Sequence, residues 1–359
     1  MFLAIYNAFP EKITIFEGQK LNMLLGMSEK ADNYKTNLFS MNTARVSAAP
    51  SYCVIPSGEA IGVKLYTDGV LVIGVGTVTD YNGIASAPAK RAGILAGDRI
   101  TAVNDVPVND NSSLKRLINS NAPSAVLTVI RDETALKVPV TAIYSKETNS
   151  YLIGLWVRDS AAGIGTLTFY NPENSTFAAL GHGICDYDTD ALLNVRDGSI
   201  NYCRVKSVKK SENGNPGEIL GEFYDTKKGD IRINSAVGIY GNTKTVPDAP
   251  LVPVASRFEV QTGKAQILCD IDGAGPKTYE IEITRISKMS KPSGKSFVFK
   301  VCDPALLEKT GGIVQGMSGS PILQNGKLVG AVTHVFVNDA SRGYGIFAEN
   351  MLDMTNIIE

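Results

Sequence analysis

The sequence has few of the residues that build several common kinds of site. Only two histidines occur among its 359 residues, and the five cysteines form no C-x-x-C pair. A zinc site needs a cluster of such ligands, so the sequence argues against a zinc protein. The number of cysteines is odd, and a chain of this length does not need disulfides to stabilise its core. The cysteines therefore indicate mostly free thiols rather than a disulfide-built secreted domain. Dinucleotide and P-loop fingerprints are absent as well. We therefore expect no metal and no cofactor.

The sequence also lacks an excess of charge and a long apolar run. Lysine and arginine number 35 against 36 acidic residues, which leaves no general polyanion-binding surface and makes nucleic acid an unexpected partner. Met1 to Phe9 are apolar apart from Asn7, but Pro10 ends the run well short of the roughly 20 residues that cross a membrane. Two interpretations stay open: the end of a membrane anchor whose beginning is missing, or a first β-strand.

What remains is typical of a folded protein rich in strands. Apolar residues make up 44%, and the 34 glycines indicate many tight turns. The length favours two or three domains. We take residues 1–50 as a lead-in region, 51–145 as a compact module and 146–359 as a β-rich domain. The last of these contains many runs of four to seven strand-forming residues separated by turn signals, which predict a β-barrel or a pair of barrels.

Residues 51–145 contain A-P-A-K-R-A-G-I-L-A-G-D-R-I, starting at Ala87. In its order of elements this region resembles a PDZ domain of the bacterial protease-associated type. Such a module binds an extended peptide along a strand edge, with the peptide terminus in a nest of backbone amides. Here the edge would be Ile61–Leu65, the nest Ser57–Glu59, and the facing helix Ser112–Ser120. The predicted peptide-binding residues are Gly58, Ile61, Gly62 and Leu117.

The strongest chemical signal is Gly316-Met317-Ser318-Gly319-Ser320-Pro321. A serine between glycines in a tight turn can present its hydroxyl, while the amides of Gly316 and Ser318 converge as an oxyanion hole. The pattern resembles the nucleophile loop of chymotrypsin-like serine proteases, with Ser318 as nucleophile. Ser320 is the rival.

A serine nucleophile needs a base, and histidine is the usual one. His182 lies in an apolar stretch pinched by Gly181 and Gly183, and it precedes the serine, as in the chymotrypsin order. We predict His182 as the base. His334 is more readily a structural residue, and its functional alternative is a side chain in the substrate cleft.

The third group should be a carboxylate that orients the imidazole. Asp303 follows the apolar strand 297–302, whereas the acidic cluster from Asp186 to Asp190 is typical of a solvated loop. Spacing alone leaves the choice open. The candidates are Asp186, Asp188, Asp190, Asp225, Asp230, Asp270, Asp272 and Asp303.

Longer motifs give a more specific resemblance. The segment 303–322, which runs into G-M-S-G-S-P-I, is similar to the SpoIVB peptidases, the stage IV sporulation protein B serine proteases; so are 330–347 and Gly181–Ile184. A PDZ module before the peptidase is the family's layout. The resemblance implies a mainly β fold, in which a PDZ domain is followed by a chymotrypsin-like β-barrel serine peptidase domain. It also implies a triad of His182, Asp303 and Ser318.

The same resemblance implies a biological role. The enzyme would be exported to the space between forespore and mother cell, and would cleave itself and a membrane-associated regulatory protein. That regulator would control a membrane protease that activates a late sigma factor. The PDZ ligand would be a peptide, either a partner's or its own chain. Family members usually begin with an anchor or signal, of which this sequence shows at most the end. The alternative function is an inactive PDZ and barrel adaptor, which the occupied triad positions disfavour.

Overall fold

The computed structural model describes residues 12–16, 45–49, 52–212, 214–288 and 294–358. The stretch Met1 to Phe9 and residues 28–37 of the lead-in therefore lie outside the described residues. Two short strands of the lead-in are present, and they pair in parallel: β1 (Lys12–Phe16) and β2 (Arg45–Ala49). Within the described residues, no helix has the length and apolar content required to cross a membrane.

The chain forms two compact units that are not continuous in sequence. The barrel unit comprises the residues up to Val63, Gly163–Gly183 and Ser199 onward; the inserted unit comprises Lys64–Ala162 and Ile184–Gly198. The predicted boundaries after residues 50 and 145 do not coincide with this division. The reason is that three long strands, β4 (Ala60–Val75), β13 (Leu155–Asn171) and β15 (Val195–Lys209), contribute residues to both units.

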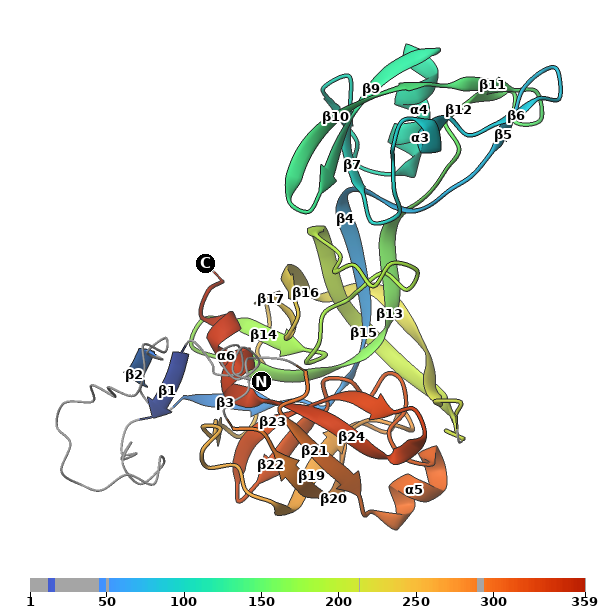
Figure 1. The fold of residues 1–359 in the computed structure, drawn as a ribbon. Helices are drawn as coiled ribbons and strands as arrows, with labels where there is room; N and C mark the ends of the chain where they lie inside the picture. Colours follow the sequence, from blue (N-terminus) through green and yellow to red (C-terminus); the bar gives the residue numbers. More distant parts are fainter. Residues whose placement is uncertain (1–11, 17–44, 50–51, 213, 289–293, 359) are drawn as a thin grey trace, which may run out of the picture. The chain divides into compact units, whose positions relative to one another are not determined.

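The barrel unit contains a closed six-stranded barrel, drawn in orange to red in Figure 1. Its strands, in spatial order, are β19 (Gly263–Cys269), β20 (Lys277–Ile286), β21 (Phe297–Val301), β24 (Asp339–Phe347), β23 (Lys327–Phe336) and β22 (Pro321–Gln324). Strict alternation builds it: in β20, Tyr279, Ile281 and Ile283 are buried while the residues between them are exposed. Each such side chain stabilises the fold by about 1.5–3 kcal/mol when fully buried. The predicted β-barrel is confirmed.

A second set of strands in the barrel unit pairs in the order β15-β16-β17-β14-β13-β3-β18. The shorter members are β3 (Cys53–Pro56), β14 (Thr176–Ala179), β16 (Glu218–Ser235), β17 (Gly238–Thr243) and β18 (Val252–Pro253). Two helices complete this unit, α5 (Pro304–Thr310) and α6 (Ala348–Thr355).

The inserted unit is a small sheet with helices. Strands pair in the order β10-β9-β7-β4, and helix α4 (Asn111–Asn121) contributes Leu114 and Ile118 to the core beneath them. Asp110 caps this helix, with its carboxylate accepting the amide of Ser113 at 2.6 Å, so the helix begins one residue earlier than predicted. The other elements are β5 (Val78–Thr79), β6 (Ala85–Ser86), α3 (Pro88–Arg91), β7 (Arg99–Val103), β8 (Val106–Pro107), β9 (Ser124–Arg131), β10 (Thr134–Thr141), β11 (Ile143–Ser145) and β12 (Ser150–Leu152).

Candidate active site

His182 sits on a tight turn that follows strand β14. Leu180 and Gly181 both have φ of +68°, the left-handed region, and so reverse the chain within two residues. A Cβ on Gly181 would lie 3.0 Å from Cγ2 of Thr333 and 3.3 Å from the carbonyl oxygen of Val332. The turn therefore packs directly on strand β23, and glycine at position 181 suits both this close approach and the left-handed φ.

The imidazole of His182 contacts one backbone carbonyl and one other ring. Its Nδ1 lies 2.8 Å from the carbonyl oxygen of Gly183, and its ring centroid lies 5.0 Å from that of His334. Burial lowers the pKa of His182, only partly opposed by the Gly183 bond, so the ring is neutral at neutral pH. A neutral ring that donates Nδ1–H to Gly183 leaves Nε2 as a proton acceptor. This is the tautomer that a general base requires.

His334, predicted as structural or as a cleft side chain, lies on the exposed side of β23 beside His182. Burial, followed by the neighbouring charges of His182 and Lys295, lowers its pKa to about 4. The two histidines of the chain thus share one location.

The nucleophile loop leaves two amides free. Along the loop, the amides of Gln315, Met317, Gly319 and Ser320 donate to backbone carbonyls at 2.7–3.1 Å. Within the described residues, the intervening amides of Gly316 and Ser318 have no such acceptor. Buried or half-buried amides are usually paired, so two alternate unpaired donors beside one hydroxyl form a ready site for an oxyanion.

The two serines of the loop have different environments. Ser318 is half-buried, and its hydroxyl donates to the carbonyl of Thr333 at 2.7 Å. Ser320 is fully buried, and its hydroxyl donates to the carbonyl of Met317 at 2.7 Å. Ser320 therefore stabilises the turn, and Ser318 is the more accessible of the two serines.

The nucleophile loop and the histidine turn touch each other. A Cβ on Gly319, where φ is +99°, would lie 2.0 Å from the carbonyl oxygen of Thr166 and 2.5 Å from the amide nitrogen of Leu180. The amide of Thr166 donates to Ser318 at 2.9 Å, and the amide of Leu180 donates to Thr166 at 3.2 Å. The nucleophile loop and the histidine turn, about 138 positions apart in the sequence, are therefore held in one site. Ser318 and His182 make no hydrogen bond with each other in this structure.

Comparison with known proteins identifies the family. The family model described as SpoIVB peptidase S55 matches residues 149–352, and a PDZ domain model matches residues 61–141. The chain belongs to the SpoIVB peptidase S55 family. It is a serine peptidase with a PDZ domain, and its predicted fold class is confirmed.

Solved structures share limited similarity with this peptidase. The Rv3671c protease of M. tuberculosis matches in an inactive form (16% identity, TM-score 0.32, 54% of this chain and 84% of that chain). Its active form matches with 16% identity, a TM-score of 0.31, and 54% and 73% coverage. The PDZ domain of the SdrC-like protein from Listeria monocytogenes shows 18% identity, a TM-score of 0.20, and 25% and 87% coverage. No curated protein matches the chain.

Asp303 does not meet the imidazole of this peptidase. One carboxylate oxygen accepts the amides of Ala305 (2.9 Å) and Leu306 (3.0 Å), and the other accepts the amide of Glu280 (3.3 Å). Asp303 is thus the N-cap of α5, and its hydrogen bonds within the described residues all go to backbone amides. The predicted contact with His182 is absent, because the following Pro304 starts a helix whose free amides take the carboxylate.

Replacing Asp303 should separate its two possible uses. Asp303→Ala should lower the free energy of unfolding by about 1 kcal/mol, whereas Asp303→Asn, which caps nearly as well, should change it little. Chemical denaturation of both variants measures this. A large loss of peptidase activity in a stable Asp303→Asn variant would show that the carboxylate leaves α5 to act on His182.

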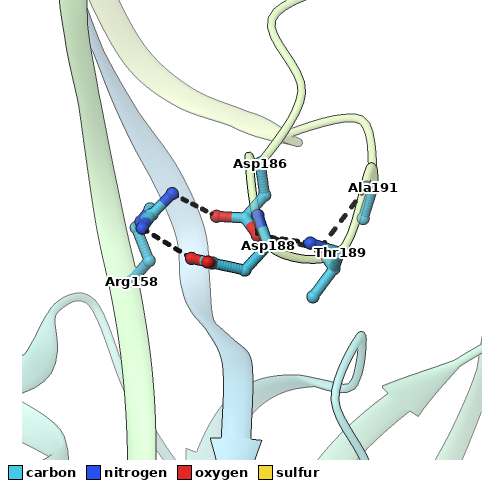
Figure 2. A network of polar contacts seen from close by, with 5 residues as sticks. All are labelled: Arg158, Asp186, Asp188, Thr189 and Ala191. Carbon is cyan, nitrogen blue, oxygen red and sulfur yellow. Dashed lines mark hydrogen bonds and ion pairs between the residues drawn. The ribbon is translucent and has the colours of Figure 1, made fainter.

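In the acidic cluster after His182, Asp188 and Asp190 are exposed, as expected of a solvated loop, but Asp186 is buried. Asp186 is 1% exposed, and its carboxylate accepts the amides of Asp188 and Thr189, the hydroxyl of Thr189 and the guanidinium of Arg158 (Figure 2). A carboxylate that accepts hydrogen bonds from turn amides can be buried, whereas a carboxylate without hydrogen-bond partners cannot. Sequence inspection missed Arg158, since nothing in its strand marks it as a partner.

Three of the remaining acid candidates have other partners. Asp272 binds Lys277 and Lys309, whose hydrogen bonds lower its pKa, Asp230 binds Lys227, and Asp270 accepts the amides of its own turn. Among the residues that the structure describes, no three His, Cys, Asp or Glu side chains gather as metal ligands would.

The PDZ model match begins at residue 61, but Gly58, Ile61 and Gly62 belong to the barrel unit. There the amide of Gly58 donates to Leu167 at 2.9 Å, and a Cβ on Gly62 would fall 2.1 Å from Cβ of Phe223. These three residues are therefore packing positions. Leu117 lies on α4 but is half-buried against the core of the inserted unit.

The inserted unit has its groove elsewhere. A groove of about 270 Å³ runs between α4 and residues 151–157, with Leu114, Ile118 and Trp156 among its lining. The side chain of Asn119 fixes its wall by bonding the amide and the carbonyl of Tyr151 at 2.8 and 3.1 Å. Ile153-Gly154-Leu155, at this wall, repeats the apolar-glycine-apolar pattern of residues 61–63. That second copy is the signal that could have located the groove.

Proposed function

We propose that this chain is a serine endopeptidase in which His182 and Ser318 perform acyl transfer. The main observation in its support is the pair of free amides at Gly316 and Ser318, on a loop that contacts the histidine turn. Nε2 of His182 would take the hydroxyl proton as Ser318 attacks the peptide carbonyl. The two amides would hold the oxyanion, and water would then release the acyl group.

One rearrangement precedes this chemistry. The hydroxyl of Ser318 donates to Thr333 and must rotate about χ1 to donate to His182. The tautomer of His182 is already set, because the carbonyl of Gly183 accepts a hydrogen bond from its Nδ1–H. In a complete triad, the carboxylate of the acid accepts this hydrogen bond. Catalytic hydrogen bonds are often incomplete before substrate binds.

Covalent labelling tests the proposal directly. A fluorophosphonate probe should modify the native protein at one residue, and mass spectrometry of the digested adduct should place the probe on Ser318. Absence of label on a correctly folded sample, or a label on Ser320, would contradict the assignment.

For the biological role we propose regulated proteolysis during endospore formation. Family membership supports it. The enzyme would act in the space between forespore and mother cell, cleave itself, and cleave a membrane-associated regulator of the protease that activates a late sigma factor. Mass-spectrometric mapping of new N-termini in wild type and Ser318→Ala tests both cleavages.

For the PDZ domain we propose binding of a peptide terminus in the groove beside α4. The peptide would extend the sheet along β13, with apolar side chains between Leu114 and Ile118. Hydrogen exchange with a bound C-terminal peptide should show protection at residues 111–118 and 151–157. Protection confined to residues 57–63 would instead restore the first assignment.

A further inference from the structure

Two cations and two aromatic rings form a row on strands β23 and β24 of the barrel (Figure 1). The rings of Phe336 and Tyr344 are stacked, with centroids 4.4 Å apart and an interplanar angle of 15°. The guanidinium carbon of Arg342 lies 4.9 Å from the Phe336 centroid, and Nζ of Lys295 lies 5.3 Å from the Tyr344 centroid. We name these four residues the cation–aromatic row. All four belong to the barrel unit, as do the serine and the histidines of the candidate site.

The row begins beside the nucleophile. The carbonyl of Thr333 accepts the hydroxyl of Ser318 at 2.7 Å. The hydroxyl of Thr333 in turn lies within hydrogen-bond distance of the carbonyls of Gly294 and, at 3.1 Å, Tyr344. A Cβ on Gly294 would lie 3.0 Å from Cε1 of His334. The backbone at Gly294 and at Tyr344 is therefore held next to the nucleophile and the histidine pair.

The row presents positive charge to solvent and to the site. Arg342 is exposed, and within the described residues no carboxylate forms an ion pair with it. An aromatic face holds a guanidinium in place without supplying a counter-charge. The residue that pairs with Arg342 on β21 is another cation, Lys300, and the carboxylate of Asp339 on the same hairpin accepts the amide and hydroxyl of Ser341. At the other end of the row, the charge of Lys295 contributes to the lowered pKa of His334.

We propose that the cation–aromatic row is a substrate subsite that selects an aspartate or glutamate close to the cleaved bond. The proposal rests on the proposed function of Ser318. The carboxylate of such a residue would meet Arg342 and Lys295, while its methylene groups would pack on the two rings. Charge complementarity of this kind gives specificity. A substrate extended beside β23 advances about 3.3 Å per residue, so an acid within about four residues of the cleaved bond would reach the row.

Cleavage of matched peptides tests this selectivity. Full-length wild type is incubated with a proteome-derived peptide library, and the cleaved bonds are mapped by mass spectrometry. We expect aspartate and glutamate to be enriched within about four residues of the cleaved bond. A mapped acidic peptide is then compared with the counterpart in which the matching amide residue replaces the acid, and kcat/KM should be higher for the acidic peptide. A library cleaved with no such enrichment would overturn the proposal.

Neutralising the row should remove the preference and leave the hydrolysis of the amide peptide unchanged. Arg342→Gln should lower the acid-over-amide ratio of kcat/KM by about 2- to 5-fold, the effect of one exposed ion pair, and Lys295→Gln/Arg342→Gln by about 5- to 20-fold. In wild type the ratio should also fall in about 1 M salt, because exposed charges are then screened. A ratio that the double variant leaves at the wild-type value would overturn the proposal.

Lys264→Gln is the matched control for Arg342→Gln. Lys264 is an exposed cation on β19 of the same barrel, where it pairs with Glu282 on β20. Its replacement removes one positive charge, as Arg342→Gln does, and should leave the acid-over-amide ratio at the wild-type value. An equal fall of the ratio in both variants would show an effect of net charge and reject the row as the cause.

Peptide binding separates this proposal from the proposed function. Ser318→Ala is titrated with an alanine-based peptide that carries adjacent glutamates, and with its glutamine counterpart, while the backbone amide signals of 334–336 and 342–344 are followed by NMR. Shifts with the glutamate peptide alone, lost when Arg342→Gln is added, support the row; no shift, or equal shifts with both peptides, rejects it. If wild-type Ser318 takes no fluorophosphonate label, the peptidase proposal fails, and these shifts still decide whether the row binds acidic residues.

Discussion

Ser318→Ala should reduce peptide hydrolysis by about 10⁶-fold and abolish fluorophosphonate labelling, because residues of a nucleophile–base unit act together and the loss of one removes the whole effect. The fold should survive. The lost hydroxyl makes one hydrogen bond, to Thr333, at a half-buried position. The variant should still hydrolyse peptides faster than water alone does, because the free amides of Gly316 and Ser318 remain.

Ser320→Ala is the control for this change. Its hydroxyl is fully buried and bonds Met317, so its removal should cost about 1 kcal/mol of stability while most activity remains. Hydrolysis of a peptide substrate and thermal unfolding of both variants measure the two effects. An active Ser318→Ala protein, or an inactive but stable Ser320→Ala protein, would move the nucleophile to Ser320.

His182→Gln is expected to have the second largest effect, a loss approaching that of Ser318→Ala. Glutamine can still meet the Gly183 carbonyl but cannot accept the serine proton. The double variant His182→Gln/Ser318→Ala should be no slower than Ser318→Ala alone, since the two residues form one unit. Rates that multiply would show that the two residues act independently.

His334→Gln is the matched comparison, since both imidazoles occupy one location. As a cleft side chain, His334 should contribute one substrate contact, and its loss should cost about 10- to 200-fold in kcat/KM. If His334→Gln were the more damaging change, the base would be His334.

The pH profile of the wild type checks the environment of the base. Burial lowers the pKa of His182 below its usual value of 6.5. The base acts only when neutral, so the rate should fall in acid with a midpoint below pH 6.5. An acidic limb that is half complete at or above pH 6.5 would contradict the buried position of the ring.

Local pattern predicted the nucleophile loop, because its function is built from consecutive residues. The backbone around Ser318 takes the left-handed φ at Gly316 and Gly319, and the motif G-M-S-G-S-P has a glycine at both of these positions. His182 followed from scarcity, since only two histidines exist. Short runs of strand-forming residues separated by turn signals predicted the barrel for the same local reason.

The assignments that the contacts in the structure do not support share a different cause. Ile61-Gly62-Val63 and Ile153-Gly154-Leu155 have the same pattern, and only packing places the first against Phe223 and the second beside α4. Asp303 reads as a buried acid in sequence, yet the amides of α5 take its carboxylate. Asp186 reads as solvated, yet Arg158 and a turn bury it.

The sequence alone therefore determined the barrel and predicted the reactive serine, its free amides and the base, because each depends on residues that are neighbours in the chain or too few to confuse. Which partner each carboxylate takes and where the groove of the inserted unit lies were decided by the tertiary structure. A polar side chain takes whichever partner folding brings within hydrogen-bond distance; for Asp186 one of these partners, Arg158, lies 28 residues away in the sequence.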